Sequence, residues 1–476
     1  MRKTLVLFLI LAAASVTFLF CGASAVNEGR DDIIITETTL AGDAAAAEGL
    51  QVRTVLNERR QLFWSTDYAV AETPKPVTAF RYYPTTRHKY GDEVRRDVYL
   101  DIGSTGFGIN GYIDLEKELE YIEENHGANQ MLLRPLADLA SRTPAGESRT
   151  EVVDLRDYYE TYPVYLQCDW AGWENDEEVV KAHWAFYQDY FRIPVQEHTY
   201  VEIFVNKDSE GRVVEVNCNT YYPEKSELDS PVEAEVMADA YTYTESAVTE
   251  DAVWLLLHGT HDYSQIKGGY GLYRIPYSWH SQYGTRKFTE PQILLDVEKI
   301  ENVYPVDPAD SEKIKLAEGT TDGEVLLLEQ REDCVSVRVL DTETMEVLQT
   351  LELNTTDLPE VWYYDDLVIF FSNDGTTSDW KLHVLRCENG IYSLWLETAF
   401  FPLNDEGYFQ QPVFAFDGER FAMAAFHQYY EVASHRITVY DREGLLYAGD
   451  YHYSSDDLTQ PITNYSWDEA LSIAWE

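Results

Sequence analysis

The chain has 476 residues and carries 84 Asp and Glu side chains against 36 Lys and Arg, so its formal net charge is −48. This charge excludes a nucleic-acid binder that works through phosphate contacts, because such a protein needs a surplus of cationic side chains. Hydrophobic residues make up 45% of the chain and charged residues 25%. That is the composition of a globular protein with a substantial core, not of a disordered acidic segment.

Residues 1–25 have the pattern of an export signal. Arg2 and Lys3 precede a long apolar run, and residues 23–25 are small, as a signal peptidase requires. We expect cleavage after residue 25, which removes two positive charges and leaves −50 on the mature chain. The expected location is extracellular or in the cell envelope.

Two alternatives to cleavage remain for this N-terminal segment. The apolar run that starts at Leu5 is long enough to stay in a bilayer as an uncleaved anchor. Lipidation of Cys21 is disfavoured, because the bulky Phe20 stands where a small residue is needed. Residues 26–48 are interpreted as a lead segment before the folded domain.

The second half of the chain repeats an Asp-centred turn followed by an apolar strand. The turns are at Asp322, Asp366 and Asp417, which are 44 and 51 residues apart. Each unit holds about four short strands in antiparallel order, with Gly, Asn and Asp at the hairpin tips, where a positive φ is needed. A period of this length with four strands is typical of a β-propeller blade.

Two further parts of the chain extend this pattern. An earlier unit is expected at 251–297, and a last unit begins at Asp468 and stops after one strand. An open sheet edge invites pairing with another chain. We therefore expect strand 470–475 to pair with the hairpin-like segment 49–66, so that the two ends of the chain close a ring.

The units resemble degenerate β-propeller repeats of the WD40 type and related proteins, although the Gly-His and Trp-Asp pairs of WD40 repeats are absent. The resemblance covers residues 240–476. It implies a mostly β fold, a propeller of about seven blades (six to eight) in one domain over 49–476. Segments 39–50, 269–277 and 303–308 also resemble uncharacterised secreted proteins of Gram-positive bacteria, a likeness that implies no activity.

A helical insertion is expected around residues 111–194. Asp114 can cap a helix over 115–126, and apolar residues at helical spacing indicate a second helix over 176–191. The strand pair at 200–219 returns to β structure.

Three segments suggest a metal site, and in each the plain structural interpretation is favoured. Residues 206–217 imitate a calcium loop, but Asn217 stands where a bidentate Glu is needed, so a hairpin turn is expected. Residues 258–262 bring two His and one Asp together without further ligands. The acidic segment 169–178 is interpreted as a solvated loop and helix start, with a weak divalent-cation site as the alternative. We expect no metal.

No catalytic motif is present. The chain has no GxSxG, Walker A or HExxH sequence, and 84 acidic residues make any carboxylate pair uninformative. Residues 372–380 resemble the Asp-box of sialidase-type propellers, with Gly375 one place early and Trp380 one place late, and this motif only braces a hairpin turn. We expect no cofactor, and whether the protein is an enzyme stays open, with a protein that is not an enzyme favoured.

Aromatic residues provide the candidate ligand site. The chain has 35 Tyr and 11 Trp, and four ring-bearing residues fall in a segment that we expect to be a loop: Tyr277, Trp279, His280 and Tyr283. Flat rings on the loops of a rigid scaffold can stack on a sugar or fill a pocket of a partner. The alternative is that these rings pack between blades.

Four cysteines follow the signal, at positions 168, 218, 334 and 387. In an exported chain they allow three disulfide connectivities. The repeat alignment places Cys334 seven residues upstream of the position equivalent to Cys387, which is about 23 Å along a strand. A disulfide needs Cα atoms within about 7 Å, so we expect no bond between these two.

These patterns together predict a secreted or cell-surface, non-catalytic binding or scaffold protein on a β-propeller-like fold. Its expected partner is an extracellular peptide, glycan or cell-wall ligand, and not a nucleic acid. A carbohydrate-active hydrolase or lyase, and a structural or sensory module of an envelope complex, remain alternatives, because propellers host all three classes.

Overall fold

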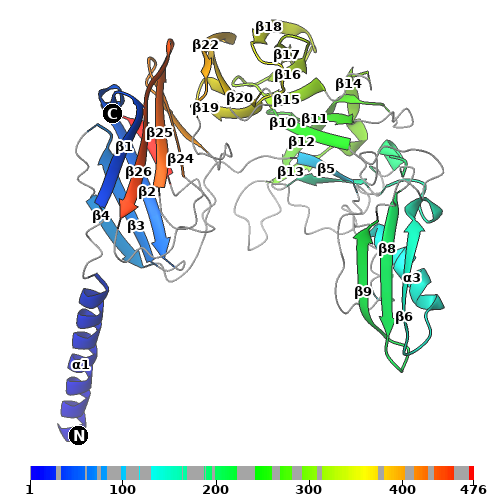
Figure 1. The fold of residues 1–476 in the computed structure, drawn as a ribbon, viewed down its shortest axis with the longest axis horizontal. Coiled ribbons are helices and arrows are strands. Elements are labelled where there is room, and N and C mark those ends of the chain that lie inside the picture. The colour runs from blue at the N-terminus through cyan, green and yellow to red at the C-terminus, as the bar shows by residue number, and fades with distance from the viewer. Residues whose placement is uncertain are drawn as a thin grey trace. The chain divides into compact units, whose positions relative to one another are not determined.

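The computed structural model contains two compact units, Met1–Val94 with Pro359–Glu476, and Arg95–Leu358. Strands form most of both units (Figure 1). The structure describes residues 2–27, 34–58, 62–71, 77–82, 98–102, 117, 130–162, 164–168, 187, 189–195, 199–221, 242–259, 268–280, 292–307, 313–373, 380–401, 412–426, 434–454 and 471–476.

Three antiparallel sheets are described in the first unit. Their orders are β1-β26-β25-β24-β23, β19-β20-β21-β22 and β27-β2-β3-β4. The strands are β1 (Ile34–Gly42), β2 (Leu50–Glu58), β3 (Leu62–Ala69), β4 (Val77–Tyr82), β19 (Glu360–Tyr364), β20 (Leu367–Asn373), β21 (Trp380–Glu388), β22 (Ile391–Ala399), β23 (Val413–Phe416), β24 (Phe421–Phe426), β25 (Ser434–Asp441), β26 (Gly444–Ser454) and β27 (Leu471–Trp475).

The second unit contains two larger sheets and two smaller ones among its described strands. The orders are β10-β11-β12-β13 with β14 also paired to β12, β15-β16-β17-β18, β6-β8-β9 and β5-β7. The strands are β5 (Val98–Ile102), β6 (Ser148–Asp154), β7 (Val164–Cys168), β8 (Tyr200–Lys207), β9 (Val213–Thr220), β10 (Thr242–Val248), β11 (Ala252–Gly259), β12 (Gly271–His280), β13 (Gln292–Leu295), β14 (Glu301–Pro305), β15 (Ile314–Glu318), β16 (Glu324–Gln330), β17 (Val335–Asp341) and β18 (Val347–Leu353).

Helices are few. The described helices are α1 (Arg2–Asn27), α3 (Gln130–Arg142) and the short 3-10 segments η1 (Ala44–Ala47), η2 (Leu155–Asp157) and η5 (Val297–Lys299). Where the structure describes the chain, it contains no helix with the length and apolarity needed to cross a membrane.

The repeat units expected from the sequence form separate antiparallel sheets in the structure. The units that begin at Asp322, Asp366 and Asp417 contribute to β15–β18, β19–β22 and β23–β26, and the earlier unit at 251–297 forms β11, β12 and β13. Antiparallel sheets of four or five strands confirm a mostly β fold and are consistent with a propeller-like arrangement. The seven-blade ring stays a prediction.

The second strands of these sheets are buried on both faces. In β11, Val253 and Leu255 pack into one core while Trp254 packs into another. In β24, Phe421 and Met423 pack into a core with β19–β22, and the alternate residues pack into a core with β27 and β2. A strand covered on both sides reads as a continuous apolar run, which is the pattern that the repeat contains.

The two chain ends of the first unit meet in one sheet. β27 pairs with β2 in an antiparallel register that runs from Leu50 opposite Trp475 to Thr54 opposite Leu471. β2 in turn pairs with β3. The expected pairing of strand 470–475 with segment 49–66 is therefore confirmed.

The helices differ from those expected. The helix predicted over 115–126 lies outside the described residues except for Lys117, and of the one predicted over 176–191 only residue 187 and residues 189–191 are described, all helical. The helix α3 was not expected, because Pro135 interrupts its pattern. Its apolar side, with Leu136 and Leu139 fully buried, packs into the core of the second unit.

The thiols agree with the cysteine prediction. Cys218, Cys334 and Cys387 are free, so Cys334 and Cys387 are not bonded. The side chain of Cys168 lies outside the described residues.

Candidate functional site

The aromatic segment predicted as a ligand-binding loop is largely a strand. Tyr277, Trp279 and His280 belong to β12, where Tyr277 to His280 pair with β13. Tyr277 is 9% exposed, lies in the core with α3, and donates a hydrogen bond from its hydroxyl to the Thr249 carbonyl at 2.6 Å. The loop placement was wrong for these three residues, and the Tyr277 ring packs in the core.

A ligand contact by the other three residues stays a prediction. The side chains of Trp279 and His280 lie outside the described part, as does Tyr283. The strand escaped prediction because Pro276 lies inside it. On the edge of β12 opposite β11, this proline stands between the pairing with β14, which spans Gly271 to Arg274, and the pairing with β13, which begins at Tyr277, so its missing N–H leaves no gap in either ladder.

The calcium-like segment 206–217 forms the β8–β9 hairpin. One Asp208 carboxylate oxygen accepts hydrogen bonds from the amides of Glu210 and Arg212, each at 2.9 Å, and the other pairs with the Arg212 guanidinium at 2.7 Å. These bonds, led by the Arg212 amide, lower the pKa of Asp208. The carboxylate braces the turn, as the structural interpretation required.

Two further hairpin-turn aspartates brace their turns in the same way, and one of them is the repeat residue Asp417. Asp341 accepts hydrogen bonds from the amides of Glu343 and Thr344 at 3.0 and 2.7 Å, and Asp417 accepts them from the amides of Glu419 and Arg420 at 2.9 and 2.6 Å. The Thr344 amide bond leads the lowering of the Asp341 pKa. Aspartates of the repeat are therefore turn residues.

The other metal candidates give no site. His258 is buried in β11, while the remaining His and Asp of 258–262 and the acidic segment 169–178 lie outside the described residues. Within the described part, no group of three or more His, Cys, Asp or Glu side chains could hold a metal ion. The Asp-box-like segment falls at the β20–β21 hairpin, whose turn lies outside the described residues.

A hollow of ≈ 290 Å³ lies on the three-stranded sheet β6-β8-β9. It is lined by one hydroxyl, two carboxylates, two amides and one aromatic ring: Thr150, Glu202, Glu215, Asn217, Asn219 and Phe204. No Lys or Arg is in this lining. We call this feature the sheet hollow.

Strand alternation produces the sheet hollow. Val201, Ile203 and Val205 are fully buried in the core against α3, so the alternate residues of β8, Glu202 and Phe204, point to the opposite face. Figure 1 shows α3 beside this sheet. Phe204 is half-buried on this face, which also carries the exposed Val152 of β6 opposite Glu202.

The strand register sets the order of the lining residues. Glu202 is opposite Asn219, Phe204 is opposite Asn217, and two residues further along Asn206 is opposite Glu215. The ring and the Asn217 amide therefore lie midway, with one carboxylate toward each end of the sheet hollow. The carboxylates are four residues apart along the strands, which is about 13 Å at their Cα atoms.

The Asn217 amide contains an unsatisfied polar atom. Its Oδ1 is buried and has no hydrogen-bond partner among the described atoms. A buried acceptor without a donor is destabilising by roughly 1 to 3 kcal/mol. A ligand donor that reaches this oxygen would recover that free energy.

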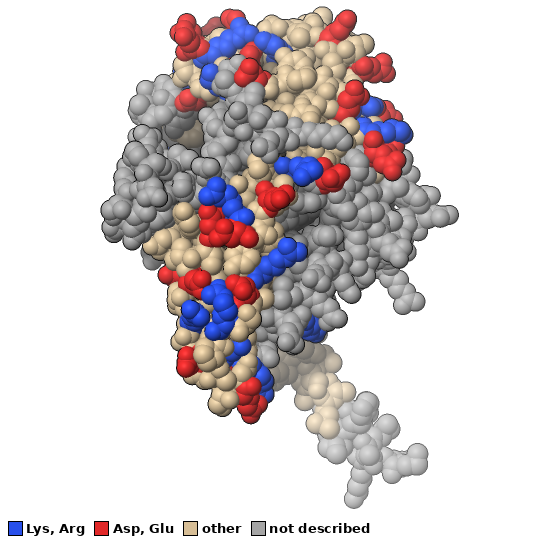
Figure 2. Space-filling model, turned by 90° about the vertical axis from the view of Figure 1, so that its right-hand side faces the viewer, with Lys and Arg blue, Asp and Glu red and all other residues tan. Residues whose placement is uncertain are grey.

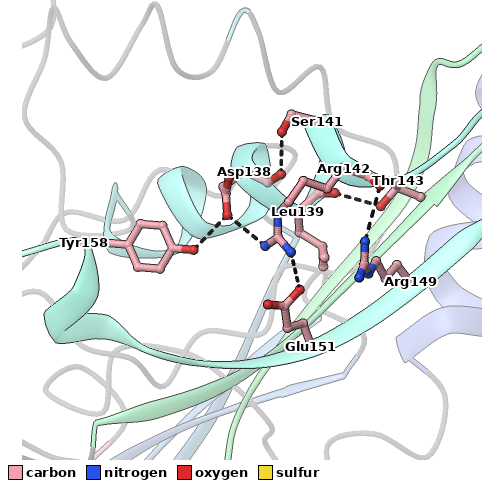
Figure 3. Close-up of polar contacts among 8 residues, drawn as sticks. All are labelled: Asp138, Leu139, Ser141, Arg142, Thr143, Arg149, Glu151 and Tyr158. Carbon is pink, nitrogen blue, oxygen red and sulfur yellow. Dashed lines mark hydrogen bonds and ion pairs between the residues drawn. The ribbon is translucent and has the colours of Figure 1, made fainter.

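An ion-pair cluster fixes α3 to the sheet. Arg142 donates to Glu151 of β6 and to Asp138 of its own helix, both at 2.8 Å, and the Tyr158 hydroxyl donates to Asp138 at 3.1 Å (Figure 3). The Arg142 hydrogen bond leads the lowering of the Asp138 pKa, and burial raises the pKa of Tyr158. This cluster positions the strand that carries Thr150.

Charges on this side of the molecule are mixed. In Figure 2 the described Lys and Arg side chains lie next to Asp and Glu and form no patch of one sign. Salt bridges of Arg142 with Asp138 and of Arg212 with Asp208 show the same pairing. The described part of this face therefore carries side chains of both signs, although the whole chain has a net charge of −48.

Other titratable groups lie inside cores. His383 is fully buried, and burial lowers its pKa to about 4, so it is neutral at physiological pH. Arg436 and Asp450 form a buried bidentate pair with distances of 2.6 and 3.0 Å. His435 hydrogen-bonds Tyr68 and stacks on Tyr451. None of these polar groups opens to a described hollow, so they are parts of the scaffold.

Comparisons with known proteins show remote likenesses only. No family model and no curated protein matches the chain. Similar solved structures include the β-propeller domain of the Trilobed protease from Pyrococcus furiosus (11% identity, TM-score 0.20, covering 44% of this chain and 71% of that one). A neuraminidase-like protein of A/little yellow-shouldered bat/Guatemala has 9% identity and a TM-score of 0.24, covering 45% of this chain and 58% of that one.

A putative 6-phosphogluconolactonase from Bacteroides uniformis has 7% identity and a TM-score of 0.28, covering 90% of this chain and 99% of that one. The chain spans little more than half the length of the neuraminidase-like protein. The neighbours include a β-propeller domain, but likenesses this remote establish no activity. Nothing among them supports the resemblance to secreted proteins of Gram-positive bacteria.

Proposed function

We propose that the chain is an exported, non-catalytic binding protein whose ligand occupies the sheet hollow. The scaffold is the propeller-like fold of about seven blades expected from the sequence, and the location is extracellular or at the cell envelope. The observation that carries the proposal is Phe204, an aromatic ring in the lining of the sheet hollow that is flanked by carboxylates and opposite an amide oxygen that lacks a donor.

Two properties of the lining favour binding over catalysis. No nucleophile with an adjacent base, and no metal cluster, occurs among the described residues that line the sheet hollow. The hollow lies on regular strands held by α3, and a rigid seat of this kind reduces the ordering cost of binding.

The test compares two variants of the purified full chain on an array of oligosaccharides and peptides. Phe204→Ala removes the ring from the sheet hollow. Val214→Ala is the matched control, because Val214 is a 36% exposed apolar residue of the same hairpin outside the lining. We expect Phe204→Ala to lower the affinity for the retained ligand by about tenfold or more. Val214→Ala should leave this affinity unchanged.

Two results would count against the proposal. Equal retention by wild type and Phe204→Ala, with both folded by circular dichroism, would place the ligand elsewhere. Turnover of an arrayed polysaccharide that a single carboxylate substitution abolishes would favour the hydrolase or lyase alternative.

A further inference from the structure

We infer that the ligand of the sheet hollow is a neutral, hydroxyl-rich chain, that is, a glycan whose sugar ring lies on Phe204. This inference rests on the function proposed above and names the chemical class of its ligand. It follows from three features of the lining: the balance of donors and acceptors, the absence of cations, and the positions of the carboxylates relative to the ring.

The lining offers hydrogen-bond acceptors and donors side by side. Glu202 and Glu215 are carboxylates, which only accept, whereas the Thr150 hydroxyl and the two Asn amides also donate. The buried Oδ1 of Asn217 is an acceptor without a described donor. Sugar hydroxyls both donate and accept around a ring, so they match this mixed lining.

Anionic ligands do not fit this lining. It contains two carboxylates and neither Lys nor Arg, so a phosphate, sulfate or carboxylate ligand would meet like charge without compensation. Phosphorylated or uronic-acid ligands are therefore disfavoured relative to neutral sugars.

A compact ammonium group also fits poorly. It would sit over the face of Phe204, but Glu202 is two residues from Phe204 on β8, and Glu215 is two residues from Asn217 on β9. Each carboxylate is therefore about 7 Å along the strand from the ring at Cα level, toward opposite ends. A disc-shaped ligand with an apolar face and hydroxyls at its rim contacts the ring and approaches both carboxylates, whereas one ammonium cannot.

Calorimetric titration of the full chain with defined probes tests the ligand class. Two probes are neutral hexasaccharides, one of β-1,4-linked glucose and one of β-1,4-linked N-acetylglucosamine. The charged probes are hexalysine and a hexamer of galacturonic acid. We expect at least one neutral hexasaccharide to bind and the galacturonic acid hexamer not to bind. The affinity for the neutral hexasaccharide should change less than about twofold between low and high salt, because salt screens no charge on this ligand.

Substitutions separate the roles of the lining residues. Asn217→Leu removes the buried acceptor and should lower the affinity for the neutral hexasaccharide by about tenfold. Phe204→Ala should lower this affinity to a similar extent. The double variant Glu202→Gln with Glu215→Gln keeps acceptor oxygens and should change this affinity less than about threefold. A cationic ligand would instead lose most of its affinity in the double variant. Thermal unfolding of each variant reports whether it is folded.

The outcomes distinguish this inference from the proposed function. Hexalysine binding that depends on Phe204 and is lost in the double Gln variant would overturn the glycan inference while leaving the sheet hollow as the binding site. If a neutral hexasaccharide binds and neither Phe204→Ala nor Asn217→Leu changes its affinity, both the glycan inference and the proposed binding site are overturned. If no probe binds and the array shows no ligand that depends on Phe204, both also fail.

Discussion

Glu245 and Glu318 show what single carboxylates do in this scaffold. Glu245 of β10 accepts a hydrogen bond from the Leu316 amide of β15 at 2.5 Å, and Glu318 of β15 accepts one from the Val248 amide of β10 at 3.0 Å. Strands β10 and β15 are edge strands of neighbouring sheets. The two carboxylates thus satisfy backbone donors that an edge strand leaves unpaired.

The pKa of Glu245 leads to a prediction about pH. Burial raises this pKa above 4.5, and the nearby Lys315 and the Leu316 amide offset it only in part. The ionised form is therefore disfavoured in the folded state. The stabilisation that Glu245 contributes is fully present below pH 4.5 and is lost as pH rises through the raised pKa of the folded state.

Glu245→Gln should therefore increase stability at pH 8 by about 1 kcal/mol, because a neutral amide oxygen can accept the same Leu316 hydrogen bond without a buried charge. The gain should disappear near pH 4. Thermal unfolding across this pH range measures both effects. The control is Glu250→Gln, which removes the same charge from an exposed position. A loss of stability at pH 8 in Glu245→Gln alone would contradict the account.

At the scale of elements, the clasp between β27 and β2 joins the two chain ends of the first unit. Arg420 adds to it by stacking on Trp475 at 3.9 Å and donating to the carbonyls of Ala46 and Glu48 at 2.9 and 3.0 Å. Ile473 of β27 is 7% exposed and packs with β2 in the core, while the next residue, Ala474, is exposed.

The register of this clasp predicts that substitutions at neighbouring positions change the free energy of unfolding by very different amounts. Ile473→Asp should lower the free energy of unfolding by about 3 kcal/mol or more, because it places an unpaired charge in the core. Ala474→Asp should change it by about 0.5 kcal/mol at most, since its side chain faces solvent. Urea unfolding followed by circular dichroism measures both. Similar losses in the two variants would show that the strand has another register.

The sequence predicted the strands that are buried on both faces better than the other elements. Continuous apolar runs such as β11 and β24 can be recognised directly, and the clasp followed from an incomplete last repeat. The helix α3 was missed because Pro135 broke its periodicity, although its apolar residues still reach the core. Tyr277 was placed in a loop, whereas β12 continues through Pro276 and on one edge passes from pairing with β14 to pairing with β13.

At the scale of the whole molecule, the net charge of −48 did not indicate function. Several of the acidic residues brace turns or pair with arginines, as Asp208 does with Arg212. The sheet hollow could not be predicted, because its lining comes from three strands that are up to 69 residues apart between Thr150 and Asn219. In the sequence, Phe204 is one more aromatic residue of a strand. Only the pairing register puts it between two carboxylates.

Hydrogen–deuterium exchange of the full chain, with and without the neutral hexasaccharide that binds best, tests the central claim most directly. Amides of β6, β8 and β9 should exchange more slowly in the presence of the sugar, and the Phe204→Ala variant should lose this protection. Protection confined to β12, the strand that carries Tyr277 and Trp279, with β8 and β9 unchanged, would contradict the account.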